Sequence, residues 1–258
     1  MISVCIATHN GERYIKEQIN SILPQLDKND EIIISDDGST DNTLQIILSY
    51  NDPRIQILIF QQPDSSSFHK LDRQQLNTLY ASRNFENALI HAKGDYIFLC
   101  DQDDVWYPEK VKNIMRCLET YDIVKHDFST IDSLGNLIKE SNYNAYCQRK
   151  RSLLYLIKYL PFRGCCIAFK RSILTMALPF PKRCLQHDSW IGMIARINDY
   201  SFCYYDKPLI YHRLHDKNVS ELGNPNNLYY KIQYRLKLIT QILGHQFKHK
   251  IFKHAINF

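Results

Sequence analysis

The chain has 258 residues, of which 45% are apolar, and a formal net charge of +5 from 32 basic and 27 acidic residues. This apolar content excludes a disordered chain and supports a full-sized core. So mild a charge gives no reason to expect nucleic acid as a partner. No stretch reaches the roughly 20 apolar residues that span a bilayer.

The cysteines and the start of the chain indicate a cytoplasmic protein. Four of the eight cysteines lie in apolar, strand-like runs, where a free thiol behaves as a small buried hydrophobe. No Cys-x-x-Cys pair or Cys/His spacing indicates zinc or disulfides, which favours a reducing compartment. The first apolar run, Ile2–Ala7, has no basic leader before it, so we expect no signal peptide.

The first hundred residues alternate apolar runs with helical patterns. Strands are expected at 2–7, 31–35, 55–60 and 96–100, and helices at 12–23, 41–50 and 83–93. The polar segment 61–79 has no periodicity and is expected to be a loop over a site. Such alternation is typical of an α/β fold with a mixed, mostly parallel sheet flanked by helices.

The second half is less regular. Helices are expected at 108–120 and 187–197, and strands at 122–126, 164–169 and 201–205. We expect one domain over 1–222, with halves 1–110 and 111–222, and a C-terminal helical extension over 223–258.

Polar clusters follow three of the expected strands. They begin at Thr8, at Asp36 and at Asp101. Because ligands of open α/β sheets bind beyond the carboxyl ends of the strands, all three clusters at one edge predict a site.

The third cluster is Asp101-Gln102-Asp103-Asp104. Like charges this close repel unless a cation lies among them. Alternate residues of a strand face the same side, so Asp101 and Asp103 are expected to close on one ion, and oxygen ligands suit Mg²⁺ or Mn²⁺. The alternative is an acidic loop that caps the next helix.

The second cluster, Asp36–Asp41, allows two interpretations. Asp-Gly-Ser-Thr-Asp is typical of turns and helix caps. Capping does not explain two carboxylates, Asp36 and Asp37, at the strand end, where an acidic residue can accept hydrogen bonds from a base or a ribose. No Gly-rich phosphate loop is present, so a metal would have to meet the phosphate charge.

Four segments together resemble the family 2 glycosyltransferases, which have the GT-A fold. They are Val4–Asn10, Asp36–Asp41, Gly94–Ile97 and Asp101–Trp106. The likeness extends to about residue 220. The form Asp-Gln-Asp-Asp-Val-Trp, with His187-Asp188-Ser189-Trp190 later, is similar to a rhamnosyltransferase-type branch.

This resemblance implies a nucleotide-sugar donor held through Mg²⁺ or Mn²⁺. The first half would bind the donor and the second half the acceptor. The residues implied for nucleotide-sugar binding are Thr8, His9, Asn10, Asp36, Asp37, Arg83 and Asp101. The implied metal ligands are Asp103, Asp101 and His215, with an ordinary surface histidine as the alternative for His215.

Inverting transfer needs a base that deprotonates the acceptor hydroxyl. The residue pattern alone favours Asp188 as a helix cap. The family places its base in an equivalent acidic motif, so the resemblance assigns Asp188 as the base, with His187 in support.

The implied function is metal-assisted, inverting transfer of a sugar from a dTDP- or UDP-sugar to a hydroxyl of a growing cell-surface glycan. The acceptor would be a glycan or a lipid-linked glycan. Two alternatives are a nucleotidyltransferase that acts on a sugar phosphate and a catalytically inactive glycan-binding or scaffold protein.

The tail, 223–258, has six Lys or Arg and no acidic residue. Its apolar residues recur at helical spacing as Ile232, Leu236, Ile239, Leu243, Phe247 and Ile251. Such a stripe packs on its own domain or on a second subunit of a homodimer, or lies on an anionic membrane. The membrane alternative corresponds to a peripheral protein at the inner face of a bacterial plasma membrane.

Overall fold

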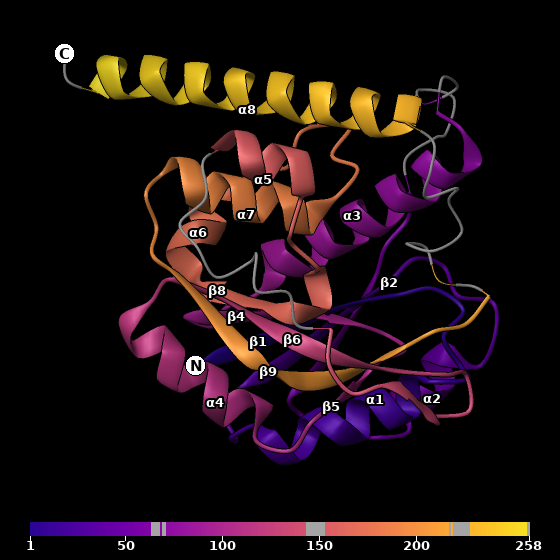
Figure 1. Cartoon of the computed structure of the whole chain (residues 1–258). Coiled ribbons are helices and arrows are strands. Elements are labelled where there is room, and N and C mark those ends of the chain that lie inside the picture. The colour runs from indigo at the N-terminus through magenta and orange to yellow at the C-terminus, as the bar shows by residue number, and fades with distance from the viewer. Residues whose placement is uncertain (63–67, 69–70, 143–152, 217, 219–227, 257–258) are drawn as a thin grey trace.

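A computed structural model describes residues 1–62, 68, 71–142, 153–216, 218 and 228–256. In this part of the chain, one nine-stranded sheet lies between two layers of helices (Figure 1). The strands are β1 Ile2–Thr8, β2 Glu31–Asp36, β3 Ile55–Ile59, β4 Tyr96–Asp101, β5 Val105–Trp106, β6 Ile123–Ile131, β7 Leu137–Lys139, β8 Ile167–Lys170 and β9 Phe202–Arg213.

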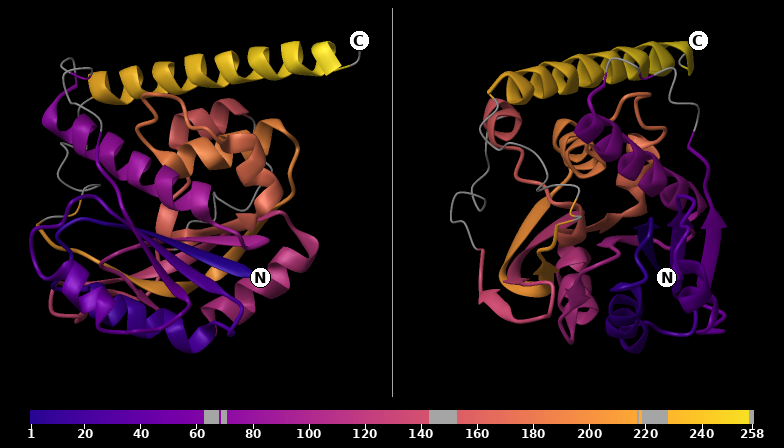
Figure 2. Two further views of the ribbon diagram at one scale, coloured as in Figure 1. Left: turned by 180° about the vertical axis from the view of Figure 1, so that it is seen from behind. Right: turned by 90° about the vertical axis from the view of Figure 1, so that its right-hand side faces the viewer.

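The helices cover both faces of the sheet. They are α1 Ile15–Ile22, α2 Thr43–Leu48, α3 Arg73–His91, α4 Lys110–Thr120, α5 Leu153–Tyr159, α6 Arg171–Ala177, α7 His187–Ile197 and α8 Leu228–Ile256, with short 3₁₀ turns η1 Leu23–Gln25 and η4 Gly164–Cys166. Helices α3 and α5–α8 lie over one face, and α1, α2 and α4 over the other (Figures 1 and 2). Among the described helices, none combines the length and the apolar content needed to cross a membrane.

The strand order is β3-β2-β1-β4-β8-β6-β9-β5, with β7 paired to β6. Strands β3, β2, β1 and β4 run parallel, whereas β8 is antiparallel to both β4 and β6. In the register, Thr8 lies beside Asp36, and Ala7 beside Asp101. The three predicted polar clusters therefore meet at one edge, and the expected mixed α/β fold is confirmed.

Strand β1 shows why the sheet is covered on both faces. Val4 and Ile6 pack into the core shared with α1 and α4, and Cys5 packs into the core shared with α3 and α7. All three side chains are fully buried. Alternate residues point to opposite faces, so a continuous apolar run is required for a strand between two helical layers.

The expected loop 61–79 is partly wrong, because α3 already begins at Arg73. Asp72 forms a capping box, in which its carboxylate accepts from Gln75 N at 2.8 Å. The first residues of α3 are polar, so they do not show the apolar spacing by which a helix is predicted. Residues 63–67 and 69–70 of the expected loop lie outside the described part.

Strands β6 and β9 are longer than expected. They pair in parallel along most of their lengths, from Ile123 beside Phe202 to Ile131 beside Arg213. Polar side chains on the outer half of each strand broke the apolar pattern on which the sequence prediction relied. This extension of β9 carries His212 and Arg213 to the edge where the polar clusters meet.

Helix α8 packs on the domain with a different face from the predicted stripe. Tyr234, Leu238 and Ile242 are buried, whereas Leu236 is 58% exposed and Ile232 and Leu243 are also exposed. Arg235 donates from Nη2 to Lys158 O at 2.6 Å, at the end of α5. The prediction that the apolar stripe packs on the domain is therefore wrong for these exposed residues. The face of α8 that packs on the domain is the neighbouring one, which carries Tyr234, Leu238 and Ile242. Phe247 and Ile251 have side chains outside the described part.

Candidate active site

The ends of β1 and β2 are joined by buried hydrogen bonds. Thr8 Oγ1 donates to Asp36 Oδ2 at 2.8 Å, and Asp36 also accepts from Ser39 N at 2.8 Å and Ser39 Oγ at 2.6 Å. Thr8 and Asp36 have almost no exposed surface. In this structure Thr8 and Asp36 hold the loop after β2, and their role in nucleotide binding stays a prediction.

Three other predicted contacts line the same edge with exposed or half-buried side chains. His9 Nδ1 donates to Asp37 O at 2.7 Å, and Asn10 Oδ1 accepts from Thr40 N at 2.8 Å. Asp37 Oδ2 accepts from Gln62 Nε2 at 2.7 Å. Burial raises the pKa of Asp37, so a donor from a ligand would stabilise its charged form.

The acidic loop after β4 meets the segment after β9. Asp103 Oδ2 lies 2.8 Å from His215 Nε2, and both side chains are largely buried. The ring of His215 stacks on Tyr14 with 5.0 Å between centroids. His215 is therefore not an ordinary surface histidine, and with Asp103 it presents an oxygen and a nitrogen at one point.

Asp101 and Asp104 have different surroundings. Burial, and then the charges of Asp104 and Asp103, raise the pKa of Asp101 to about 7. Asp104 Oδ1 accepts from His212 Nδ1 at 2.9 Å and from Arg213 N at 3.1 Å, so it holds β9. Despite the burial of Asp104, His212 lowers its pKa. Capping of the next helix is not its role.

The predicted ligand set is only partly brought together. Asp103 and His215 are in contact, but Asp101, Asp103 and His215 do not form a cluster with all ligand atoms within 4.8 Å. The period-two argument failed because β4 ends at Asp101, and Asp103 lies in the following turn. Within the described residues, such a cluster is formed by Asp104, Cys165 and His212, all buried.

The residues present fit a divalent cation at Asp103 and His215. The carboxylates of Asp101, Asp103 and Asp104 crowd one loop, and their repulsion is part of what raises the pKa of Asp101. A cation beside Asp103 would relieve that repulsion. In the buried cluster, by contrast, both ring nitrogens of His212 are engaged, Nδ1 by Asp104 and Nε2 by Arg163.

Helix α7 begins at His187, as predicted, and Asp188 lies in its first turn. The N-cap is Gln186, so Asp188 is not the cap. Asp188 Oδ1 accepts from Ser189 N at 2.6 Å. His187 stacks on Phe85 with 4.0 Å between centroids, and its Nε2 is buried without a partner in the described structure.

Turn η4 brings α7 toward the acidic loop. A Cβ added at Gly164 would lie 2.8 Å from His187 Nε2 and 3.9 Å from Asp188 Cβ. The next residue, Cys165, is in the buried cluster with Asp104. Residues 164 and 165 therefore connect the predicted base to the acidic loop, although 23 residues separate Gly164 from His187.

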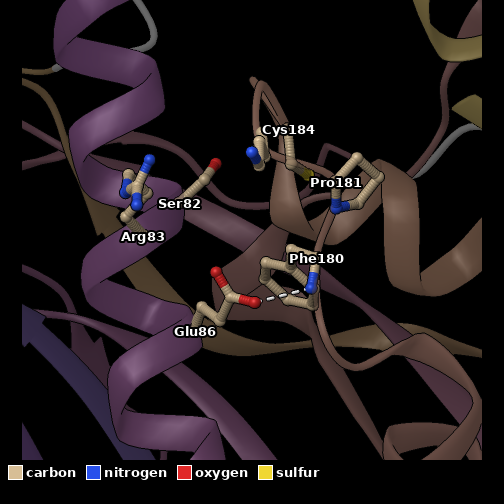
Figure 3. Close-up of a pocket in the computed structure, with 7 residues that line it drawn as sticks. Ser82, Arg83, Glu86, Phe180, Pro181 and Cys184 are labelled. Carbon is tan, nitrogen blue, oxygen red and sulfur yellow. Dashed lines mark hydrogen bonds between the residues drawn. The ribbon is translucent and has the colours of Figure 1, made fainter. Parts of the chain in front are cut away.

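Arg83 lines a small cavity between α3 and residues 180–184 (Figure 3). Glu86 Oε1 accepts from Phe180 N at 2.5 Å across it, and the guanidinium of Arg83 lies over the Phe68 ring. The cavity holds about 90 Å³. Ligand pockets of proteins usually reach roughly 300–1,000 Å³, so this cavity is too small for a nucleotide sugar.

Sequence reasoning missed residues that assemble the site. Gln102 clamps the backbone of His9, accepting from its N at 3.0 Å and donating to its O at 3.1 Å. Lys110 is buried, donates to Cys165 O at 3.1 Å and lies over the Trp106 ring. A lysine in an amphipathic helix normally faces solvent, so no sequence signal marked it.

A family model described as "Glycosyl transferase family 2" matches residues 3–175, which is more than half of the chain. The chain belongs to glycosyl transferase family 2. The matched range includes the polar clusters after β1, β2 and β4, as well as η4. It ends before α7, so the family model leaves the role of Asp188 untested.

Among relatives in the family, a dTDP-rhamnosyl transferase, RfbG of Shigella flexneri, is 31% identical over 243 residues, covering 89% of this chain and 77% of RfbG. The putative glycosyltransferase EpsE of Bacillus subtilis is 34% identical over 137 residues, and the match covers 52% of this chain and 45% of EpsE. The family prediction, and with it the class of enzyme, is confirmed.

Solved structures agree on the fold. S. aureus TarS 1-349 in complex with UDP-GlcNAc matches with a TM-score of 0.63 at 19% identity, covering 92% of this chain and 66% of TarS 1-349. Glucosyl-3-phosphoglycerate synthase from Mycobacterium tuberculosis, in complex with Mn²⁺, UDP and glucosyl-3-phosphoglycerate, matches with a TM-score of 0.56 at 18% identity, covering 95% of this chain and 79% of that protein.

Proposed function

We propose that this chain transfers a sugar, with inversion, from a nucleoside-diphosphate sugar to a hydroxyl of a cell-surface glycan. The observation that carries the proposal is the contact of Asp103 with His215 at the edge where the polar clusters meet. Residues 164 and 165 lead from this acidic loop to Asp188. A base and a set of acidic ligands near one another are what inverting transfer needs. Membership of the family sets the nucleotidyltransferase alternative aside.

Asp188 is proposed as the general base. Its Oδ1 is engaged by Ser189 N, which fixes the carboxylate and leaves Oδ2 to take the proton of the acceptor hydroxyl. Asp188 lies in the first turn of α7, where the helix dipole favours an acidic side chain. His187, packed on Phe85, holds this turn in place.

Asp103 and His215 are proposed to hold Mg²⁺ or Mn²⁺, with Asp101 beside them toward the donor. When bound, the ion supplies positive charge to the departing diphosphate. Mn²⁺ is present in the complex of the mycobacterial synthase with UDP, which favours a divalent ion in the shared fold. The carboxylate oxygen of the pair suits either ion, whereas the imidazole nitrogen favours Mn²⁺, because Mg²⁺ is the harder ion and takes oxygen ligands.

His9, Asn10 and Asp37 are proposed as the nucleoside contacts. The donor is proposed to be a dTDP-sugar, with rhamnose as the first candidate, because RfbG is named a dTDP-rhamnosyl transferase. UDP-sugars are the second candidate, since the solved neighbours bind UDP.

The test is release of nucleoside diphosphate from a panel of dTDP- and UDP-sugars, with Mn²⁺ or with EDTA, and with lipid-linked glycans as acceptors. We expect turnover with Mn²⁺ and its loss in EDTA. Asp103→Ala is expected to abolish turnover, whereas Glu119→Ala, an exposed carboxylate of α4, leaves it unchanged. A wild-type protein that binds no nucleotide sugar would instead be the inactive glycan-binding or scaffold protein.

We further propose that α8 holds the enzyme on the anionic cytoplasmic face of a bacterial membrane. The exposed apolar face of Ile232, Leu236 and Leu243 lies on a helix whose segment has six basic and no acidic residues. The described cysteines are free thiols, which agrees with a cytoplasmic setting. Flotation with vesicles of anionic lipid tests this, and Leu236→Glu is expected to reduce binding. Binding that is unchanged, or a dimer in solution, would favour a subunit contact.

A further inference from the structure

A chain of hydrogen bonds leads from the acidic loop to Arg163. His212 Nδ1 lies 2.9 Å from Asp104 Oδ1, and its Nε2 lies 2.9 Å from Arg163 Nη1. Asp104 is 1% exposed and His212 4% exposed. Ordering a side chain as long as arginine costs conformational entropy. Because His212 and Asp104 are buried and bonded to each other, the hydrogen bond to His212 holds the Arg163 guanidinium in one place.

The hydrogen bonds also define the protonation of His212. Burial lowers the pKa of His212, whereas the Asp104 carboxylate raises it and prevails. A guanidinium has only N–H donors, however, so in this arrangement Nε2 must accept and Nδ1 must donate to Asp104. His212 is thus neutral while it holds Arg163, and Asp104 keeps its charge.

Arg163 stands between the two halves of the proposed machinery. It directly precedes Gly164, the residue packed against His187 and Asp188. Its guanidinium lies 4.7 Å from the centre of the Phe128 ring and experiences the charges of Asp104 and Asp101. The guanidinium is therefore linked through His212 to the acidic loop, and the backbone of residue 163 adjoins the turn that contacts α7.

The positive charge of Arg163 is not paired with a carboxylate. Within the described residues, the nearby Arg213 forms an ion pair with Glu17 at 2.6 Å, whereas Arg163 forms no ion pair and its hydrogen-bond partner is His212. A largely buried cation without an ion-pair partner is costly, so an anionic ligand at the guanidinium would be stabilised.

The chemistry of Arg163 fits a phosphate group. The hydrogen bond to His212 engages Nη1 of Arg163. Within the described residues, each remaining nitrogen of this side chain keeps some exposed surface. Its remaining N–H groups can therefore be reached by a ligand. A planar guanidinium offers two parallel donors to phosphate oxygens, which a lysine cannot do.

We propose that Arg163 binds the distal (β) phosphate of the donor diphosphate, and that His212 and Asp104 are positioning residues that aim it. This inference rests on the proposed function, because it takes the donor to be a nucleoside-diphosphate sugar. Arg163 would stabilise the negative charge that forms on that phosphate as the bond to the sugar breaks.

The test compares dTDP with dTMP, which lacks the distal phosphate, by titration calorimetry in Mn²⁺. For Arg163→Ala we expect dTDP binding to weaken about 10- to 100-fold, the range for one charged hydrogen-bonded contact, and dTMP binding to change less than about twofold. Arg116→Ala, an exposed arginine of α4, serves as the matched control and should change neither.

Two further variants separate binding from folding. Arg163→Gln keeps a donor for His212 Nε2 and so preserves the packing, yet it should show the same selective loss for dTDP. His212→Ala should also weaken dTDP selectively, and His212→Gln should restore part of that loss, because an amide can still donate to Asp104 and accept from Arg163.

Equal losses for dTDP and dTMP, or no loss, in a folded Arg163→Gln protein would overturn the inference while leaving the proposed function intact. If the wild-type protein bound UDP but not dTDP, UDP and UMP would take their places in the same comparison. If it bound neither diphosphate, the proposed function and this inference would both fail.

Discussion

Gly164→Ala tests the contact that joins the two parts of the site. The new Cβ would lie 2.8 Å from His187 Nε2, closer than real Cβ atoms approach such a neighbour. The ring cannot easily retreat, because it stacks on Phe85 at 4.0 Å. We therefore expect the first turn of α7, with Asp188, to be displaced.

Two effects of Gly164→Ala can be estimated: overpacking lowers the free energy of unfolding, and displacement of Asp188 lowers kcat. An extra methyl group in a packed site costs about 1–3 kcal/mol of the free energy of unfolding. A shift of the base by about 1 Å lowers kcat roughly 100-fold. The affinity for dTDP should change much less than kcat, because His9, Asp37 and Asp103 lie on other loops and the clash of the new Cβ is with α7 rather than with the side chain of Arg163.

Kinetics of nucleoside diphosphate release, dTDP titration and thermal unfolding measure the three quantities. Gly244→Ala is the control, since no atom lies within 4 Å of its added Cβ and α8 should gain about 0.5–1 kcal/mol. In a His187→Ala background, Gly164→Ala should cost less than about 0.5 kcal/mol, because the clash partner is gone. Unchanged kcat and stability in the single variant would refute the contact.

Two further predictions concern the frame around the site. Leu238→Ala, at a buried position of α8, should lower the free energy of unfolding by about 2–5 kcal/mol, whereas Leu236→Ala on the exposed face should change it by less than about 0.5 kcal/mol; equal effects in chemical denaturation would contradict the assigned faces. Asp122 accepts from Ser201 N at 2.9 Å, and the bonds from Ser201 and Lys170 lower its pKa despite its partial burial. Its stabilisation is therefore present above the unfolded pKa of about 3.9 and is lost as pH falls through the folded value. Asp122→Asn should be less stable than the wild type at pH 7, with a difference that shrinks below about pH 4; a difference that grows on acidification would show that the sign is wrong.

Most strands and helices of the first half were predictable because each is marked by the apolar pattern of its own segment. Continuous apolar runs and a periodic helix leave few alternatives for β1, β2 and β4, and α7 has the predicted bounds. Strand β9 was predicted too short, since the polar residues His212 and Arg213 that it carries are satisfied by Asp103 and Asp104, more than 100 residues away. The sequence pattern of a segment does not show hydrogen-bond partners that are distant in the chain.

The same reason limits what the sequence shows of the site. Clusters at strand ends indicated an edge, and Asp103 and His215 meet there. The turn that removes Asp103 from the plane of β4 could not be seen, nor could the burial of Asp36. Arg163 carries no motif, because its place depends on two buried residues distant in sequence, Asp104 in the loop after β4 and His212 on β9.

The most direct test of the central claim is Asp188→Asn, which keeps the shape of the side chain and removes its basicity. The amide oxygen of the new side chain can still accept from Ser189 N, so α7 should remain in place. The account predicts that this variant binds dTDP and Mn²⁺ like the wild type and that transfer to the acceptor falls by a factor of about 100 to 10,000, the usual contribution of a general base. Transfer at the wild-type rate would contradict it.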